Sequence, residues 1–150
     1  MILTPTELIN MGLNIGSEIP QAKLTAAITE AELSVIKPAI GDTAYIAALA
    51  LQATDALVQG GQTVNPKGET VYIAGLKKAA GYIAFACLIR HTMQSTNFGT
   101  VQKNDEHSTN TDPWEWSRYN FGVGTRFLRE VAAAAGWPCK LGDTTFMWNL

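Results

Sequence analysis

The stretch that decides the fold is Ala79 to Ile89, AAGYIAFACLI, an uncharged run of eleven residues closed by Lys78 and Arg90. A helix that spans a membrane needs about 20 apolar residues. This run is therefore too short to cross a bilayer, and it belongs inside protein. A helix that is apolar nearly all round is buried on most sides. We therefore predict a central helix over residues 69–96.

Two capping signals of the same form predict a first and a last helix. Thr4-Pro5-Thr6-Glu7 and Asp112-Pro113-Trp114-Glu115 each combine an N-cap side chain, a proline at the first helical position and a glutamate three residues after the cap. Such residues bind the free N–H groups of a first turn and suit the positive end of the helix dipole. They predict a short helix over residues 5–13 and a long one over 113–135, which Gly136 and Pro138 end.

Two more helices and a corner are predicted between these signals. Apolar residues recur at helical spacing over residues 20–36, and Lys37-Pro38 is expected to break that helix because proline disfavours helical geometry in the residue before it. Gly41 then allows a tight corner at which Tyr45 packs on the preceding helix, and Asp42 caps a helix over residues 43–58. Gly60-Gly61 ends this helix, and Asn65-Pro66-Lys67-Gly68 marks a turn in a polar loop.

The predicted fold is all-α: a small bundle of three long helices plus a short N-terminal helix. One domain covers residues 1–136, including a projecting polar loop over 97–111, and an extended tail covers 137–150. The core is expected to consist of apolar positions at helical spacing, namely Leu24, Ile28, Val35, Tyr45, Leu49, Leu76, Ile83, Leu88, Val123, Phe127 and Val131.

The loop and the tail are candidate contact segments. The loop, NFGTVQKNDEHSTNT, offers only Phe98 and Val101 for burial, with Lys103 beside them, so it is expected to project from the domain. The tail is rich in the large apolar residues that anchor interfaces. It either reaches a partner or packs back on its own domain, and its candidate contacts are Trp137, Leu141, Phe146, Met147, Trp148 and Leu150.

Composition favours an assembly subunit. Only 16% of the chain is charged and 47% is hydrophobic, whereas about 25% of an ordinary domain is charged, so we expect other protein to cover much of its surface. A net charge of −2 argues against a dedicated nucleic-acid binder. The two cysteines match no metal-binding spacing and are expected to be free thiols. The N-terminus lacks the pattern of a signal peptide, which predicts synthesis in the cytoplasm.

No catalytic, metal or cofactor motif stands out. Asp105-Glu106-His107 places three titratable groups together, but adjacent side chains on a loop point in different directions, so we expect no site there. A polar, partly basic stripe is expected on the last helix, opposite Trp116, Val123, Phe127 and Val131; it consists of Arg118, Gly122, Thr125 and Arg129, with Arg126 alongside. This stripe is a solvated face, a contact for an acidic partner surface or, least favoured because a few arginines give little phosphate affinity, a contact for duplex DNA.

The order of these parts resembles that of the small helical head–tail connector (adaptor or neck-ring) proteins of tailed bacteriophages, of the type found in Bacteroidetes phages and prophages. The resemblance covers roughly residues 5–135. It rests on the corner Lys37-Pro38-Ala39-Ile40-Gly41-Asp42-Thr43-Ala44-Tyr45, on the helix that begins LKKAAGYIA at residue 76, and on the stretch NFGTV at 97–101. The aromatic tail departs from the family pattern.

The resemblance implies a structural virion protein without enzymatic activity or cofactor. It implies a ring, a dodecamer in most members, that extends the portal channel and joins the capsid to the tail. In such a ring the loop over 97–111 would lie on a neighbouring subunit or face the channel. The partners would be the portal protein and a tail or second neck protein, and DNA would pass without specific binding; no membrane is implied. Two alternatives stay open: a small helical regulatory or protein-binding module, and an enzyme that uses residues 105–107.

Overall fold

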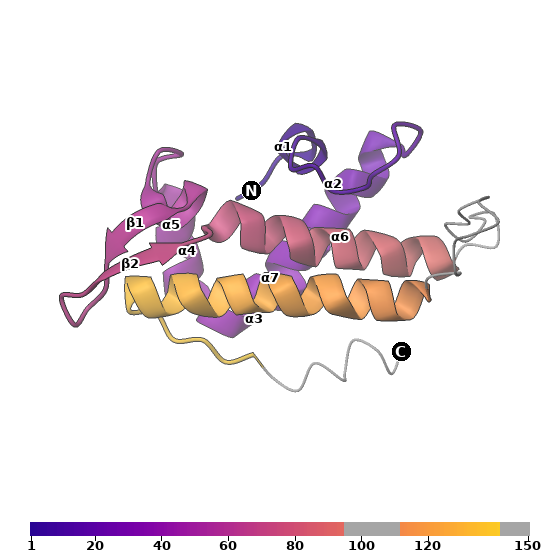
Figure 1. Ribbon diagram of the computed structural model, residues 1–150. Coiled ribbons are helices and arrows are strands. Elements are labelled where there is room, and N and C mark those ends of the chain that lie inside the picture. The colour runs from indigo at the N-terminus through magenta and orange to yellow at the C-terminus, as the bar shows by residue number, and fades with distance from the viewer. Residues whose placement is uncertain (95–111, 142–150) are drawn as a thin grey trace.

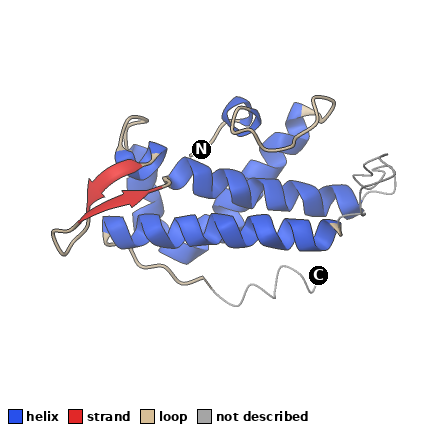
Figure 2. Ribbon diagram, in the orientation of Figure 1, coloured by secondary structure: helices blue, strands red, loops and turns tan. Residues whose placement is uncertain are grey.

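The computed structural model describes residues 1–94 and 112–141. Its two longest helices, α6 (Leu76–Gln94) and α7 (Pro113–Ala135), lie antiparallel against each other along the length of the molecule (Figure 1). A second layer of helices lies behind this pair and packs mainly on α6. A small two-stranded sheet stands at one end (Figure 2). The fold is mostly helical, as predicted, and it contains in addition a small sheet that the predicted helical bundle did not include.

Helix α6 is the centre of the fold. All of its residues from Ala79 to Ile89 are buried except Tyr82, which is half-buried. Gly124 of α7 lets the two helices approach closely, because a Cβ at this position would lie 2.6 Å from Cγ1 of Ile83 and 3.0 Å from the Ala79 carbonyl oxygen. The uncharged run therefore forms the central helix as predicted. The helix begins at Leu76 rather than at residue 69.

The first helix starts as its capping signal predicts but is shorter. In α1 (Pro5–Ile9) the Thr4 hydroxyl accepts from the Glu7 N–H, and the Glu7 carboxylate accepts from the Thr4 N–H. The chain leaves helical geometry before Gly12, whose φ is +78°. The predicted end at residue 13 was therefore too late.

The predicted break at Lys37-Pro38 was also wrong. Helix α2 (Gln21–Glu30) continues through a π-helical segment, η1 (Ala31–Ile36), into α3 (Lys37–Ile40). The Lys37 N–H bonds the Glu32 carbonyl, five residues back. In a regular α-helix the ring of Pro38 would clash with the carbonyl four residues earlier, and the wider π turn admits the ring without ending the helix. The helix ends at Gly41, whose φ is +87°.

The predicted helix over 43–58 consists of two shorter helices. Helix α4 spans Asp42–Ala50, and α5 spans Ala56–Gln59 with the Asp55 side chain as its N-cap. The predicted polar loop and the start of the predicted central helix form a hairpin instead, with β1 (Gly61–Val64) antiparallel to β2 (Thr70–Ile73). The sequence TVYI in β2 is rich in residues that favour strands.

Helix α7 has the predicted bounds, with the Asp112 side chain accepting from the Trp114 N–H and Gly136 in the left-handed conformation. Its buried face is rotated from the predicted one. Phe121, Gly124 and Leu128 face the core, whereas the expected core residues Val123 and Phe127 are half-buried and Leu49 of α4 is 44% exposed. The other expected core positions are buried: Leu24, Ile28, Val35, Tyr45, Leu76, Ile83, Leu88 and Val131.

Candidate functional site

The corner residues lie around one buried carboxylate. Glu32 of η1 is 1% exposed, and its Oε1 accepts from the Ile2 N–H at 2.8 Å and from the Tyr45 hydroxyl at 3.1 Å. Burial, with the Glu32 charge and hydrogen bond, raises the pKa of Tyr45 to about 12. Tyr45 therefore packs on the first long helix, as predicted, and Glu32 is a buried partner that the periodicity did not single out.

The remaining corner residues are structural. Gly41 adopts a positive φ, and a Cβ there would meet nothing within 4 Å, so its constraint is backbone geometry rather than space. Asp42 begins α4, and its carboxylate lies 3.9 Å from Nζ of Lys37; the Asp42 side chain is 80% exposed and the Lys37 side chain 41%. Exposed pairs of this kind contribute little to stability. The corner thus orients α4 and offers no reactive group.

Helix α4 carries an unpartnered apolar surface. Its outward residues are Ile46, Ala47, Leu49 and Ala50, which we call the α4 face; Ile46 is 66% exposed. No charged residue occurs from Thr43 to Thr54. The lack of charge in this segment therefore indicates an apolar outer surface, whereas helical spacing alone predicts Leu49 in the core.

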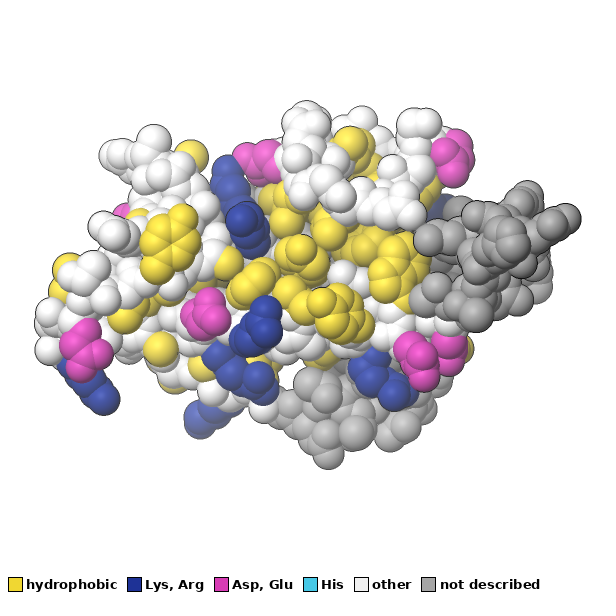
Figure 3. All heavy atoms as spheres, viewed as in Figure 1, with side chains coloured by type: hydrophobic (Ala, Val, Ile, Leu, Met, Phe, Trp, Pro, Cys, Tyr) yellow, Lys and Arg dark blue, Asp and Glu magenta, His cyan; other side chains and the backbone are white. Residues whose placement is uncertain are grey.

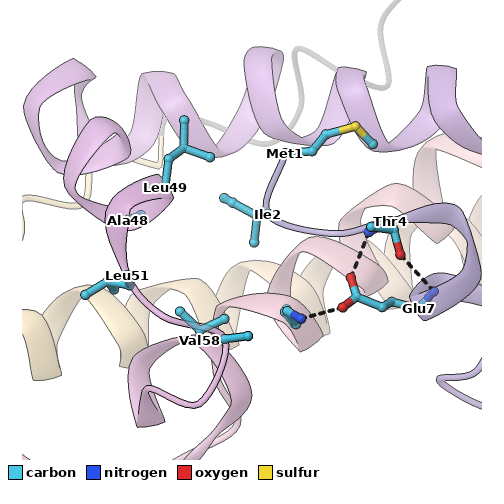
Figure 4. A pocket seen from close by; sticks show the side chains of 10 residues that line it. Met1, Ile2, Thr4, Glu7, Ala48, Leu49, Leu51 and Val58 are labelled. Carbon is cyan, nitrogen blue, oxygen red and sulfur yellow. Dashed lines mark hydrogen bonds and ion pairs between the residues drawn. The ribbon is translucent and has the colours of Figure 1, made fainter.

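A shallow pocket adjoins the α4 face. It has a volume of about 190 Å³, and Ala48, Leu49 and Leu51 line it opposite the N-terminal segment and Val58 (Figure 4). At its polar end Glu7 forms an ion pair with Lys77 of α6. The Lys77 hydrogen bond holds the pKa of the Glu7 carboxyl below its usual value. The one acid and the one base that line the pocket therefore pair with each other.

The other layer exposes an aromatic surface along the α6–α7 contact. Two of its half-buried rings, Tyr82 and Phe127, pack edge-on against each other, and a third, Trp116, packs edge-on against the buried Phe85. With Tyr119 and Val123, which lie on the same side of α7, they form a surface that we call the aromatic strip: Tyr82, Trp116, Tyr119, Val123 and Phe127. Figure 3 shows hydrophobic side chains gathered along the middle of this face.

Lys and Arg side chains lie beside that hydrophobic area in Figure 3. The predicted basic residues Arg118, Arg126 and Arg129 are exposed on α7. The guanidinium of Arg126 lies 5.4 Å from the centre of the Phe127 ring, so one cation touches the aromatic strip directly. Thr125, which was expected on the same polar stripe, is buried in the core.

A further cluster of ionisable side chains joins α2 to α6. The Glu30 carboxylate pairs with Arg90 and contacts Nε2 of His91. Cys87 lies in the core one turn before His91. Burial, with the negative charge of Glu30, raises the pKa of the Cys87 thiol to about 12. A buried thiol that stays protonated is a poor nucleophile. Over residues 1–94 and 112–141, no group of three or more potential ligands could hold a metal ion.

The first tail residues lie on their own domain. Trp137 and Leu141 are half-buried against the core, and the Lys140 N–H bonds the Ala39 carbonyl at 2.7 Å. For residues 137–141 the structure therefore agrees with the alternative in which the tail packs back on its own domain. The candidate contacts Phe146, Met147, Trp148 and Leu150, the loop residues Phe98, Val101 and Lys103, and the cluster at 105–107 lie outside the described residues.

None of the described helices is both long and apolar enough to cross a membrane alone. One pair, residues 21–40 followed by α4, meets the length and composition required only when the two are taken together, and it is bent by 119°.

Comparison with known proteins gives one match. A family of unknown function, DUF6712, matches residues 36–120, more than half of the chain, and the protein belongs to this family. The matched region runs from the end of η1 through the corner, α4, the hairpin and α6 into the first third of α7. No curated protein and no solved structure shows significant similarity.

Proposed function

We propose that this member of the DUF6712 family is a structural virion protein, a head–tail connector ring subunit that extends the portal channel and joins the capsid to the tail. The observation that carries the proposal is the α4 face. A helix that is apolar all round is normally buried, but residues 1–94 and 112–141 leave one side of α4 exposed. Such a surface is typical of a subunit that other protein covers.

The chemistry of the described residues favours a structural role over catalysis. The buried ionisable groups are held by structural contacts: Glu32 by Ile2 and Tyr45, and Arg90 by Glu30. These contacts join α2 to α6, join η1 to α4 and fix the N-terminal segment. A subunit that holds a capsid and a tail together needs this rigidity and needs no reacting group.

The specific assignment to the head–tail junction rests on the sequence resemblance at the 37–45 corner and at the start of α6. On this proposal the partners are further copies of the chain, the portal protein and a tail or second neck protein. The protein is made in the bacterial cytoplasm and ends in the virion. A net charge of −2 suits a channel through which DNA slides without being held.

Electron microscopy of the purified protein, combined with native mass measurement, tests the proposal. We expect closed rings whose channel admits duplex DNA, and no measurable binding of duplex DNA at physiological salt. A protein that stays a monomer or dimer at every concentration, alone and with portal protein, would instead support a small regulatory or protein-binding module. Tight DNA binding would also contradict the proposal.

A further inference from the structure

Two apolar surfaces lie on different layers of the fold, and neither has a partner within the described chain. The α4 face belongs to the layer behind α6 and α7, and the aromatic strip belongs to that pair itself (Figure 1). Ile46 on the first surface and Tyr119 on the second are 66% and 68% exposed. Single exposed apolar residues are common on proteins, but contiguous apolar surfaces mark interaction sites.

The segments that carry the two surfaces differ in charge. From Lys37 to Pro66, the segment that contains α4, there are two acidic residues, Asp42 and Asp55, and one basic residue, Lys37, whose Nζ lies 3.9 Å from the Asp42 carboxylate. From Pro113 to Leu141, the segment that contains α7, there are four basic residues and two acidic ones. Asp42 is exposed at the start of α4, and Arg126 lies against a ring of the aromatic strip.

The aromatic strip is long enough to receive the α4 face. At 1.5 Å per residue, the five residues from Ile46 to Ala50 extend for about 8 Å, and the α7 part of the strip, from Trp116 to Phe127, extends for about 18 Å. One exposed helix face laid along an aromatic strip is a common way for two proteins to pack. Aromatic and arginine side chains are the residues most enriched at interface hot spots.

We infer that the α4 face of one copy packs on the aromatic strip of the next copy, with Asp42 facing the arginines of α7. This inference rests on the proposed function and names the partner of both surfaces as a second copy of the chain. Two different surfaces that complement each other make a head-to-tail contact, and such a contact closes into a ring when the rotation between copies allows it. A self-complementary patch would give only a two-fold dimer.

Disulfide trapping between different variants tests this pairing. Ile46→Cys and Tyr119→Cys are each introduced in a Cys139→Ser background, and Cys87 can remain because it is fully buried. We expect dimers when the two single variants are mixed and oxidised, none from either variant alone, and a ladder of larger species from the double variant. Dimers from Ile46→Cys alone would show a two-fold contact and overturn the inference.

A disrupting substitution gives a second readout. Ile46→Asp should raise the protein concentration needed for assembly at least tenfold, because it puts a charge into the centre of the contact. Leu33→Asp is the matched control, since Leu33 is 50% exposed on η1 and lies on neither surface. Reversing the charges singly, with Asp42→Arg or Arg126→Glu, should weaken assembly, and the double reversal should restore part of it. Equal assembly by Ile46→Asp and Leu33→Asp would contradict the proposed contact.

The outcomes separate this inference from the proposed function. Rings that form without cross-linking between positions 46 and 119 would overturn the inference and leave the connector proposal standing. Cross-linked open chains that never close would support the contact and contradict the connector ring. A chain that remains monomeric throughout would overturn both.

Discussion

The Tyr45 hydroxyl donates a hydrogen bond of 3.1 Å to Glu32, and the same carboxylate oxygen accepts the Ile2 N–H at 2.8 Å. One buried carboxylate therefore joins three parts of the chain: the N-terminal segment, the π-helical turn of η1 and helix α4. Because Tyr45 lies on the inner side of α4, this contact helps to determine the position of the α4 face on the opposite side. A change in the position of Glu32 is thus expected to shift α4 and, with it, the α4 face.

Tyr45→Phe should lower the free energy of unfolding by about 1–3 kcal/mol, because Glu32 loses one donor while it stays buried. Chemical denaturation followed by circular dichroism measures this change. Tyr72→Phe is the matched control, since Tyr72 projects from the hairpin into solvent, and its substitution should leave stability unchanged. Equal effects of the two substitutions would show that the hydrogen bond to Glu32 contributes nothing.

The Tyr45 contact also predicts a loss of stability in alkali. Its pKa is about 12 in the folded protein and about 10 in the unfolded chain. The folded state therefore favours the protonated phenol, and this contribution is complete below pH 10 and declines as the pH rises from 10 towards 12. Unfolding free energies measured across this range should fall less steeply for Tyr45→Phe than for the wild type. Parallel curves would contradict the assignment.

Gly41→Ala should destabilise the protein by about 1–3 kcal/mol, because side chains other than glycine rarely adopt its φ of +87°. The space around the position is open, so Gly41→Val should add little beyond this backbone strain. Thermal or chemical unfolding of both variants measures the effect. A Val variant that is much less stable than the Ala variant would point to crowding instead of strain.

Two glycines on one helix give a matched pair. Gly122 of α7 is exposed and a Cβ there meets nothing within 4 Å, whereas a Cβ at Gly124 would lie 2.6 Å from Ile83. Gly122→Ala should therefore stabilise the protein by about 0.5–1 kcal/mol through helix propensity. Gly124→Ala should destabilise it by about 1–3 kcal/mol by forcing α6 and α7 apart. Unfolding midpoints of the two variants that shift in the same direction would contradict this account.

The close approach of α6 and α7 at Gly124 explains why the sequence did not predict which side of α7 faces the core. Hydrophobic spacing places the largest apolar residues, such as Trp116 and Phe127, at the centre of a contact. The close approach to α6 instead puts small residues, Ser117 and Gly124, at the centre and moves the large rings to its edge. The helix bounds were predictable because Asp112 and Gly136 act through local geometry, whereas the rotation depends on the neighbouring helix.

The predictions at Pro38 and at the hairpin were wrong for related reasons. A proline ends a helix unless the preceding turn widens, and the π turn of η1 that admits Pro38 has no simple sequence signal. The strand β2 is only four residues long, too short for its alternation to outweigh the helical run that follows. The α4 face, by contrast, could have been predicted from the sequence. A helix buried on one side normally carries charged residues on its other side, whereas the twelve residues from Thr43 to Thr54 contain none.

Truncation separates the tail residues that stabilise the domain from those beyond them. A chain that stops after Gly136 loses the half-buried Trp137 and Leu141 and the Lys140–Ala39 hydrogen bond. Its free energy of unfolding should fall by about 2–4 kcal/mol, since burial of one large apolar side chain contributes roughly 1.5–3 kcal/mol and these two are partly buried. A chain that stops after Leu141 keeps all of these contacts and is the matched control. We expect the midpoint of thermal unfolding to drop for the first truncation and to stay within about 2 °C of the full chain for the second. If both truncations unfold together with the full chain, residues 137–141 do not hold the domain, and the interpretation of Trp137 and Leu141 as part of its core is wrong.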